Sequence, residues 1–455
     1  MKNFKRIIFS FFAMFMVIMT VNAKNVADFT ELETCLTTTG NVCTLSKNVE
    51  LDNTIEIAGE VALDLNGYVI SLSDTYAGID SMFVVLHGGK LTVNDSSAAK
   101  TGKITTENNA NVFVGIKMTK AGGDNSKTAT LIVNGGTIEG TDYAISGNGN
   151  LGRDNTDVTV NGGTLIGGTV GIFQPNIGKV TINGGKITGA TGIEMRAGEL
   201  VVNGGEIIAT ATEVTLNPSG NGASSSGVGI AIMQHTTKHE INVVVKDGEV
   251  KGAAALYQSN IQNNDQTSID KISINVEGGN FEATNENEKA VYSENIEKYV
   301  VGGTFNTELD NSAVSANITT KVENGITYVG EENDVNITEP TNGTVKVDKN
   351  IAVSGQIVNI TATPNKGYEI DKILVKDAQG SEIKVTDNSF VMSDSEVDVT
   401  VTFKKVADAK EESATVPAIP ETPKTGDSVL TYVILGMISI GGIFITLNEL
   451  KKRYN

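Results

Sequence analysis

The residues best suited to chemistry in this sequence lie in one Gly-rich stretch, where Arg153 is followed directly by Asp154 and then by Asp157. A cluster of acids can hold Ca²⁺, and a base beside such a cluster can abstract a proton. Acids in a Gly-rich loop are also commonly just solvated. Arg153, Asp154 and Asp157 are therefore candidate catalytic residues, and none is assigned.

Other pairs of polar residues favour structural roles. His235 and His239 have the spacing of a zinc-binding pair on a helix, but the sequence around them is β-like and Thr236 stands where a zinc protease has Glu. We therefore expect no metal and no cofactor. Arg196 follows Glu194 closely, and we expect a surface ion pair of small energy. No two Asp residues are adjacent in the sequence, which disfavours hydrolysis by paired carboxylates.

A repeated segment supplies the elements that must position these side chains. Its copies share a pair of small residues, mostly two glycines, flanked on both sides by alternating apolar residues, which predicts strands with one buried face. Glycine allows the positive φ that a tight turn requires. The clearest copies are LIVNGGTI (131–138), VTVNGGTL (158–165), VTINGGKI (180–187) and LVVNGGEI (200–207), and the weaker ones are VVVKDGEV (243–250), INVEGGNF (274–281) and KYVVGGTF (298–305).

A third short strand follows in several copies: YAIS (143–146), VGIF (170–173), TGIEM (191–195) and VGIAIM (228–233). One coil of three strands cannot bury its own inner face, whereas stacked coils share a core. The sequence therefore predicts an all-β fold with a parallel β-helix. One polar residue recurs before the glycine pair: Asn134, Asn161, Asn183 and Asn203. We expect these amides to hydrogen-bond to one another along the stack, although a polar binding stripe is the alternative.

The start of the stack has a characteristic pattern. Residues 28–36 predict a short amphipathic helix, and residues 41–46 predict a strand. This arrangement resembles the N-terminal cap of pectate-lyase-like right-handed β-helices, in which a helix covers the first coil. The resemblance covers about residues 26–330 and implies a right-handed parallel β-helix. Several families of this fold are polysaccharide lyases or hydrolases, but a fold by itself implies no activity.

A second domain is predicted at residues 331–405, where the repeat ends. Four segments there indicate strands: GTVKV (343–347), IVNITATP (357–364), EIDKILVK (369–376) and VDVTVTFKK (397–405). The stretch from residue 361 to residue 405 resembles the divergent internalin-type B-repeat, a β-grasp-like module. The resemblance implies a spacer on a bacterial surface protein, and some such modules take part in adhesion.

Both ends of the chain carry targeting segments. Residues 1–23 combine a basic start, an apolar run and a small-residue cleavage site, which predicts a secretory signal peptide. Residues 427–455 contain an uncharged apolar run at 429–447, followed by three basic residues. This pattern predicts a transmembrane helix with a cytoplasmic C-terminus.

A short motif stands just before this span: Pro423, Lys424, Thr425 and Gly426. It ends a Pro-rich stretch, residues 406–426, whose composition predicts an extended stalk. The motif, the apolar span at 429–447 and the basic tail together resemble the cell-wall sorting signal of Gram-positive surface proteins. The resemblance implies that a sortase cleaves after Thr425 and joins the chain to peptidoglycan. Thr422 replaces the usual Leu, so a plain membrane anchor through 429–447 is the alternative.

Charge and cysteine content limit the partners. The 455-residue chain has 35 Lys and Arg against 54 Asp and Glu, a net charge of −19, which repels phosphate backbones and excludes nucleic acid as a partner. Its two cysteines are Cys35 and Cys43. An exported location favours a disulfide between them, with two buried thiols as the alternative.

Together these features predict a non-enzymatic display or adhesion protein on the extracellular face of a Gram-positive cell envelope. The flank of the β-helix, or its longer loops 208–227 and 258–270, would bind a host or cell-surface ligand. The alternative is an extracellular polysaccharide lyase or hydrolase built on the β-helix. The expected order is signal peptide 1–23, β-helix with helical cap 24–330, B-repeat-like domain 331–405, stalk and sorting motif 406–426, and membrane helix with basic tail 427–455.

Overall fold

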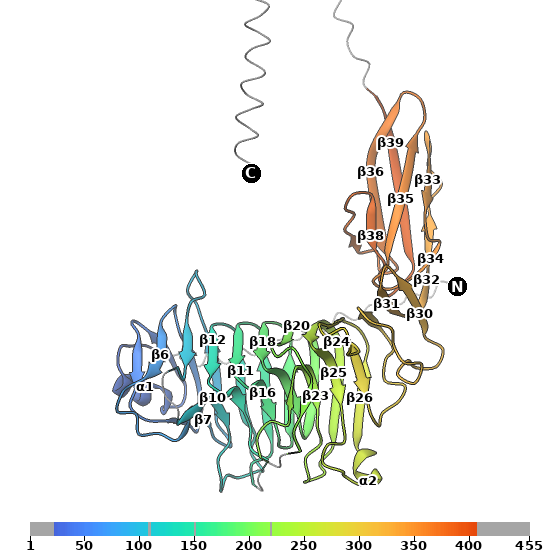
Figure 1. Cartoon of the computed structure of the whole chain (residues 1–455). Helices are drawn as coiled ribbons and strands as arrows, with labels where there is room; N and C mark the ends of the chain where they lie inside the picture. The colour runs from blue at the N-terminus through green and yellow to red at the C-terminus, as the bar shows by residue number, and fades with distance from the viewer. Residues whose placement is uncertain (1–21, 108–110, 150–151, 219–220, 407–455) are drawn as a thin grey trace, which may run out of the picture. The chain divides into compact units, whose positions relative to one another are not determined.

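The computed structural model describes residues 22–107, 111–149, 152–218 and 221–406. The regular elements of these residues are strands, apart from the helices α1 (Phe29–Leu36) and α2 (Gln266–Ile269) (Figure 1). The predicted all-β fold is therefore confirmed.

Strands up to Phe305 form coils of three, and equivalent strands of successive coils pair in parallel, which makes a parallel β-helix. Face 1 consists of β1 (Asn22–Val26), β2 (Asn41–Leu45), β5 (Glu60–Asp64), β8 (Lys90–Asn94), β11 (Ala129–Val133), β14 (Thr156–Val160), β17 (Gly178–Ile182), the first halves of β20 (Gly198–Ala209) and β24 (Ile241–Gly252), and β26 (Ile272–Val276). Face 2 consists of β3 (Val49–Leu51), β6 (Val69–Leu72), β9 (Lys103–Thr105), β12 (Thr137–Gly140), β15 (Thr164–Gly167), β18 (Lys186–Gly189), the second halves of β20 and β24, β27 (Asn280–Ala283) and β29 (Gly303–Phe305).

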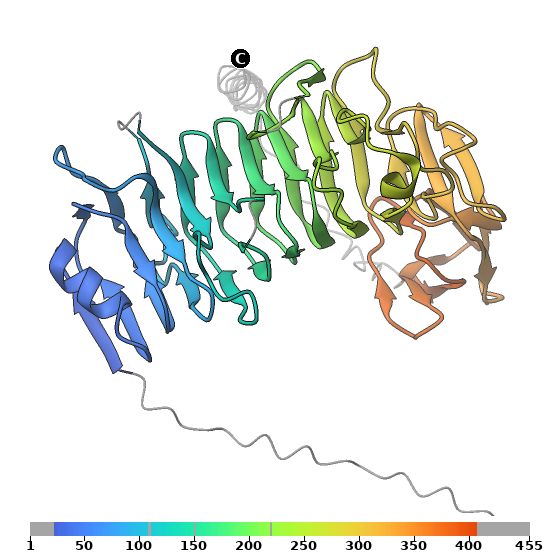
Figure 2. The same cartoon turned by 90° about the horizontal axis from the view of Figure 1, so that it is seen from below.

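Face 3 closes each coil. It consists of β4 (Ile55–Ile57), β7 (Asp80–Val85), β10 (Val112–Met118), β13 (Tyr143–Ser146), β16 (Val170–Gln174), β19 (Thr191–Met195), β23 (Val228–Ile232), β25 (Ala254–Gln258) and β28 (Val291–Ser293). Between β20 and β23 the chain leaves the coil, and the short antiparallel strands β21 (Thr215–Leu216) and β22 (Ser225–Ser226) lie in this excursion. Figure 2 shows the coils stacked one after another, with α1 (dark blue) at the first coil.

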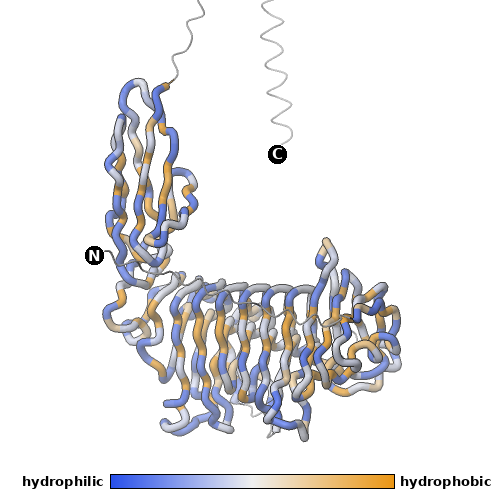
Figure 3. Tube along the Cα trace, turned by 180° about the vertical axis from the view of Figure 1, so that it is seen from behind, coloured by the Kyte–Doolittle hydropathy of each residue, from blue (hydrophilic) through white to orange (hydrophobic). Residues whose placement is uncertain are grey.

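The inner side of each face is apolar because alternate residues of a strand point inward. On face 1, Val133, Val160, Ile182 and Val202 are register partners in successive coils, and each is 0% exposed. Hydrophobic and hydrophilic residues alternate along these strands in Figure 3. The repeat therefore builds one continuous core, as the sequence predicts.

The expected row of asparagines is present at the corner between face 1 and face 2. Nδ2 of each residue donates to Oδ1 of the asparagine one coil earlier: Asn134 to Asn94 (2.9 Å), Asn161 to Asn134 (2.8 Å), Asn183 to Asn161 (2.8 Å) and Asn203 to Asn183 (2.8 Å). The structural interpretation of these residues is thus confirmed, and Asn94 extends the ladder by one coil.

The predicted helical cap is confirmed at the first coil. The side chain of Asp28 accepts a hydrogen bond from the Glu31 backbone N (2.9 Å) and starts α1, which buries Leu32 in the core of the β-helix. Cys35 of α1 and Cys43 of β2 are joined by a disulfide with an S–S distance of 2.09 Å. This bond fixes the cap to face 1.

The other end of the stack is closed in a way that the sequence did not predict. β31 (Ile326–Gly330) pairs antiparallel with β29 and also with β30 (Thr319–Glu323). The backbone of β29, the last parallel strand, is therefore paired on that side. The unpaired edge of the sheet is instead on β30, in the short hairpin β30–β31.

The second predicted domain is a small β domain. Its strands are β32 (Glu332–Ile337), β33 (Gly343–Val347), β34 (Ile351–Val353), β35 (Ile357–Pro364), β36 (Tyr368–Asp377), β37 (Glu382–Ile383), β38 (Ser389–Val391) and β39 (Val397–Lys405). They enclose a separate core that includes Val358, Val375, Phe390 and Val399. The four strands predicted from the sequence are confirmed, to within one residue at either end.

Several predicted segments lie outside the described residues: the signal peptide up to residue 21, the stalk from residue 407, the sorting motif Pro423, Lys424, Thr425 and Gly426, and the membrane segment 429–447. Within the described ranges, no helix is long and apolar enough to cross a membrane. Strand β1 starts at Asn22, so cleavage after Ala23 would shorten it by two residues.

Candidate functional site

The outward side of face 3 carries side chains of several chemical kinds. Lys117, Ser146, Phe173 and Glu194 are register partners in four successive coils and form one row along this face. Their sequence neighbours point inward, as Ile172 does beside Phe173. The strand alternation that builds the core thus also presents basic, hydroxyl, aromatic and acidic groups at one coil spacing.

An aromatic cluster covers part of this face. The ring of Tyr143 stacks on Phe173 (centroids 5.2 Å apart, planes at 26°) and meets Phe113 edge to face (6.5 Å, 69°). Burial raises the pKa of the Tyr143 hydroxyl above its usual value. This hydroxyl accepts a hydrogen bond from the backbone N of Ala223 (3.3 Å), so the cluster also holds the chain excursion between β20 and β23.

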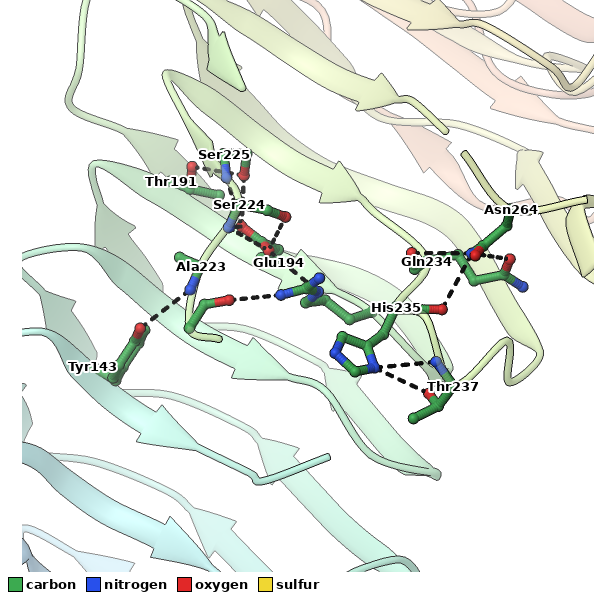
Figure 4. Close-up of polar contacts among 12 residues, drawn as sticks. Tyr143, Thr191, Glu194, Ala223, Ser224, Ser225, Gln234, His235, Thr237 and Asn264 are labelled. Atoms are coloured by element: carbon green, nitrogen blue, oxygen red, sulfur yellow. Dashed lines mark hydrogen bonds and ion pairs between the residues drawn. The ribbon is translucent and has the colours of Figure 1, made fainter. Parts of the chain in front are cut away.

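Glu194 holds the same excursion through its carboxylate (Figure 4). Oε1 accepts hydrogen bonds from the backbone N (2.9 Å) and Oγ (2.7 Å) of Ser224, and Oε2 accepts from the backbone N (3.1 Å) and Oγ (2.7 Å) of Ser225. Glu194 is 0% exposed. Four donors compensate for the burial of this charge, which would otherwise be costly.

Arg196 corrects an expectation from the sequence. Its side chain is 1% exposed, and its Nε lies 4.0 Å from Oε1 of Glu194, so the pair is buried and the expected surface ion pair is wrong. Nη1 of Arg196 donates to the carbonyl of Gly222 (2.7 Å). Burial lowers the pKa of the guanidinium, and Glu194 opposes that shift. The excursion covers both residues, which is why a pattern of neighbouring residues could not reveal their burial.

The hydrogen bonds from Ser224 and Ser225 to Glu194 are here called the clamp. A hollow of about 410 Å³, here called the central hollow, is lined by the neighbouring residues Arg196 and Gly222. Phe113 and Tyr143 line its apolar side, and Asp142, Arg196 and His235 line its polar side. A pocket with an aromatic wall and several polar groups can orient a small polar molecule or one unit of a polymer.

A second hollow, of about 780 Å³, lies nearer the first coil and is here called the N-terminal hollow. Asp80 and Lys117 line both hollows and form an ion pair (2.7 Å). Lys120 also lines the N-terminal hollow and pairs with Glu56 (2.6 Å). Arg153 completes its set of cations. The outward side of face 3 is therefore hollowed on either side of one ion pair.

The structure does not gather the three candidate catalytic residues around one point. Arg153 lines the N-terminal hollow of face 3. Asp154 accepts a hydrogen bond from the backbone N of Ile177 (2.9 Å), and Asp157 lies in β14 of face 1, in register with Lys179. Among the described residues, no ion pair joins Arg153 to either carboxylate.

The histidines take part in local contacts. Nδ1 of His235 lies 3.3 Å from Oγ1 of Thr237, and the carbonyl of His239 accepts a hydrogen bond from Gln234 (2.9 Å). Nε2 of His87 contacts the carbonyl of Asp154 (2.7 Å). Across the described ranges, no three His, Cys, Asp or Glu side chains are grouped as a metal site would require.

Sequence reasoning missed Glu194 and Tyr143 as parts of a site. One signal was available: Glu194 stands in TGIEM, in a row whose register partners are Phe173 and Ala231. An acid in an otherwise uncharged stretch of the row, followed by the long excursion 210–227, indicates that the excursion folds back over that acid.

Comparison with known proteins identifies one part of the chain. Residues 333–407 match the family described as the divergent InlB B-repeat domain. The predicted B-repeat resemblance is confirmed for this segment. No curated protein and no solved structure shows significant similarity to the chain.

Proposed function

We propose that this chain is a cell-surface anchored, non-enzymatic display or adhesion protein of a Gram-positive bacterium. The observation that carries the proposal is the match of residues 333–407 to the divergent InlB B-repeat domain, which suggests an extracellular surface or adhesion-type protein. The β-helix that precedes this domain supplies a stacked scaffold with two hollows on face 3. In this role the scaffold presents face 3 to a ligand.

The sequence of the ends supports an anchored location. In the proposal, the signal peptide 1–23 directs export, and the positive tail after 429–447 stays in the cytoplasm. A sortase then cleaves between Thr425 and Gly426 and joins the Thr425 carbonyl to peptidoglycan. If the sortase does not accept the motif, the apolar span holds the protein in the membrane.

The test is made on intact Gram-positive cells that express the full-length chain. Protease added outside the cells is expected to remove residues 24–405, and mass spectrometry of the wall fraction is expected to find a peptide ending at Thr425 with attached peptidoglycan. Thr425→Ala is the control that should abolish the linked peptide. Protein that stays intracellular and protease-resistant would overturn the proposal.

A second candidate, an extracellular polysaccharide lyase or hydrolase, is favoured by the position of Arg153 at the N-terminal hollow, which Asp80 also lines. In this candidate Arg153 would act as the base on an acidic sugar, as the resemblance to pectate-lyase-like β-helices implies. Release of unsaturated or reducing ends from acidic polysaccharides, lost in Arg153→Ala, would establish this candidate. An inert ectodomain that binds cells or matrix would favour display.

A further inference from the structure

The outward row of face 3 ends in two stacked tyrosines. Tyr257 of β25 and Tyr292 of β28 are register partners in the last two coils of this face, and their ring centroids lie 4.7 Å apart with the planes at 37°. Both residues are partly exposed, whereas Tyr143 and Phe173 in the earlier stack are 9% and 5% exposed. The last two coils therefore present aromatic surface to solvent.

The two long loops of the β-helix adjoin this pair. Tyr257 packs on an apolar cluster that contains Ala231, its register partner in the preceding coil. Val214 of the excursion and Ile261 of the loop after β25 pack on the same cluster. The tyrosine pair thus lies beside both of the segments that the sequence predicts to bind a ligand.

One carboxylate precedes β28 along the chain and another follows it. Glu294 comes directly after the strand and lies on the same side of it as Tyr292, because alternate residues of a strand share one side. Its Oε2 accepts hydrogen bonds from Oγ of Ser259 (2.7 Å) and the backbone N of Asn260 (2.9 Å), which fixes this exposed side chain in place. Glu288 comes before the strand and is partly buried.

The two carboxylates have no counter-charge. Neither Glu288 nor Glu294 forms an ion pair with another residue of the described ranges. Burial raises the pKa of the Tyr257 hydroxyl, and the charges of Glu288 and Glu294 raise it further, so both carboxylates lie within electrostatic range of the ring. Burial also raises the pKa of Glu288. A cation from outside the chain would therefore stabilise this surface.

The surrounding segment has the same sign of charge. Residues 284–297 contain four Glu and a single Lys, Lys289, and this lysine pairs with Asp310. The whole chain carries a net charge of −19. The field around the tyrosine pair therefore attracts basic partners and repels acidic ones.

The kind of cation follows from the aromatic rings. A guanidinium can lie with its flat face on a tyrosine ring while its N–H groups donate to a carboxylate at the edge of the ring. A neutral sugar could also stack on the rings, but it would leave both carboxylates without a counter-charge. Because Glu288 and Glu294 lie at opposite ends of β28, one small amine cannot neutralise both. A chain segment with more than one basic residue fits this arrangement better.

We propose that the Tyr257–Tyr292 pair, together with Glu288 and Glu294, docks an arginine-containing basic segment of a protein partner. One arginine stacks on the tyrosines and donates hydrogen bonds to a carboxylate, and a second basic residue meets the other carboxylate. This inference rests on the proposed display function and names the kind of partner that face 3 would bind.

The experiment is calorimetric titration of the purified full-length protein in a neutral detergent, at about 0.15 M salt, where charges more than about 8 Å apart are screened. The probes are the polyamine spermine and three capped peptides that alternate glycine with arginine, lysine or citrulline. Citrulline has the shape of arginine without its charge. The arginine peptide is expected to bind about tenfold or more tighter than the citrulline peptide, with the lysine peptide between them, because an ammonium lacks the flat face of a guanidinium.

Variants of Tyr257 test the role of the aromatic face. Tyr257→Leu keeps an apolar side chain and the charge of the protein but removes the ring, and it should weaken binding of the arginine peptide about fivefold or more. Tyr257→Phe keeps the ring and should bind this peptide within about twofold of the natural protein.

Variants of the carboxylates separate this site from the general negative charge of the chain. Glu288→Gln is expected to weaken binding of the arginine peptide about threefold to tenfold, because it removes the acceptor charge beside the rings. Glu249→Gln is the matched control. Glu249 is an exposed acid of β24 on face 2 that also forms no ion pair within the described ranges, so its replacement removes the same charge away from the tyrosines.

The proposal is overturned if the citrulline peptide binds as tightly as the arginine peptide, if no peptide binds, if Tyr257→Leu binds like the natural protein, or if Glu288→Gln and Glu249→Gln weaken binding equally. Tighter binding of spermine than of the arginine peptide would also overturn it, since the site would then take a small polyamine.

Surface exposure is measured separately on intact cells that express the natural protein. Exposure without peptide binding removes the partner assignment and leaves the display function standing. Peptide binding by a protein that never reaches the surface removes the display function instead.

Discussion

Oε1 of Glu194 accepts hydrogen bonds from the backbone N and Oγ of Ser224, at 2.9 and 2.7 Å, across 30 residues of chain. This pair attaches the excursion between β20 and β23 to the outward side of face 3. Glu194 anchors the excursion whose Asn221 and Gly222 line the central hollow, so its loss should affect stability and local order together.

Glu194→Ala is expected to lower the free energy of unfolding by about 3 kcal/mol or more, because it strands four donors and leaves Arg196 buried without its counter-charge. Hydrogen exchange at residues 222–226 should increase in the same variant. Glu199→Ala, which removes an exposed partner of Lys179, is the control and should change stability by less than about 1 kcal/mol. Equal effects of the two substitutions would contradict the buried clamp.

The stacked coils could be predicted from the sequence because their information is local and repeated. Val133, Val160 and Ile182 recur at fixed positions around each glycine pair, and each marks the same inward position. The clamp could not be predicted in this way. Glu194 and Ser224 are brought together by a non-repeated excursion. The row of face 3 marks Glu194 as an unusual acid, but the repeat does not show that Ser224 and Ser225 are the residues that cover it. The closing hairpin of β30 and β31 was missed for the same reason.

The difference between neighbours in the sequence and neighbours in the fold also explains why the candidate catalytic residues are not gathered in one site. The sequence singled out Arg153, Asp154 and Asp157 because they are neighbours in the chain, yet the coil path separates them. Arg153 lines a hollow of face 3, whereas Asp157 lies in β14 of face 1. The residues that share the hollow with Arg153, such as Ser81 and Lys120, come from earlier coils and are joined to it only by stacking.

The asparagine ladder predicts that replacing an interior asparagine lowers stability more than replacing a terminal one. Asn161 both donates to Asn134 and accepts from Asn183, whereas Asn203 has a single ladder bond, as donor to Asn183. Asn161→Ala should therefore cost about 1–2 kcal/mol and Asn203→Ala about half as much. Denaturant unfolding of the two variants measures the difference. A cost at Asn203 equal to or above that at Asn161 would show that the ladder bonds do not set the effect.

Asp95 predicts how the β-helix responds to acid. Burial alone would raise the pKa of its carboxyl, but hydrogen bonds from Ser97, Gly102 (2.7 Å) and Gly67 (2.9 Å) outweigh burial and hold the pKa below its usual value. Because the folded-state pKa is depressed, the stabilisation is complete above the unfolded value of about 3.9 and is lost as pH falls through the folded one. The carboxylate should therefore stabilise the neutral-pH protein relative to Asp95→Asn.

The measurement is the difference in unfolding free energy between the natural protein and Asp95→Asn as a function of pH. We expect a constant difference above about pH 5 that shrinks below about pH 4. Asp157→Asn, a substitution on the outward side of β14 where no such set of donors is present among the described residues, serves as the control. A difference that stays constant into strong acid would contradict the role of the ionised Asp95.

The glycine pairs predict that the effect of a Gly→Ala substitution on stability depends strongly on its position in the coil. Gly185 has a φ of 84°, and a Cβ there would lie 2.8 Å from the carbonyl oxygen of Gly163 in the preceding coil. Gly122 has a φ of 78°, and a Cβ there would meet no atom within 4 Å. Both substitutions to Ala pay for a left-handed backbone, at about 1 kcal/mol, whereas Gly185→Ala must also push two coils apart.

Gly185→Ala is therefore expected to lower Tm by several degrees more than Gly122→Ala. It should also speed hydrogen exchange in β15 and β18, the paired strands that follow the glycine turns of these two coils. The comparison separates backbone strain from coil spacing, because the first is common to both variants. If the two variants melt together, close stacking of the glycine turns is not what holds neighbouring coils at their spacing, and the apolar rows inside the faces must set it alone.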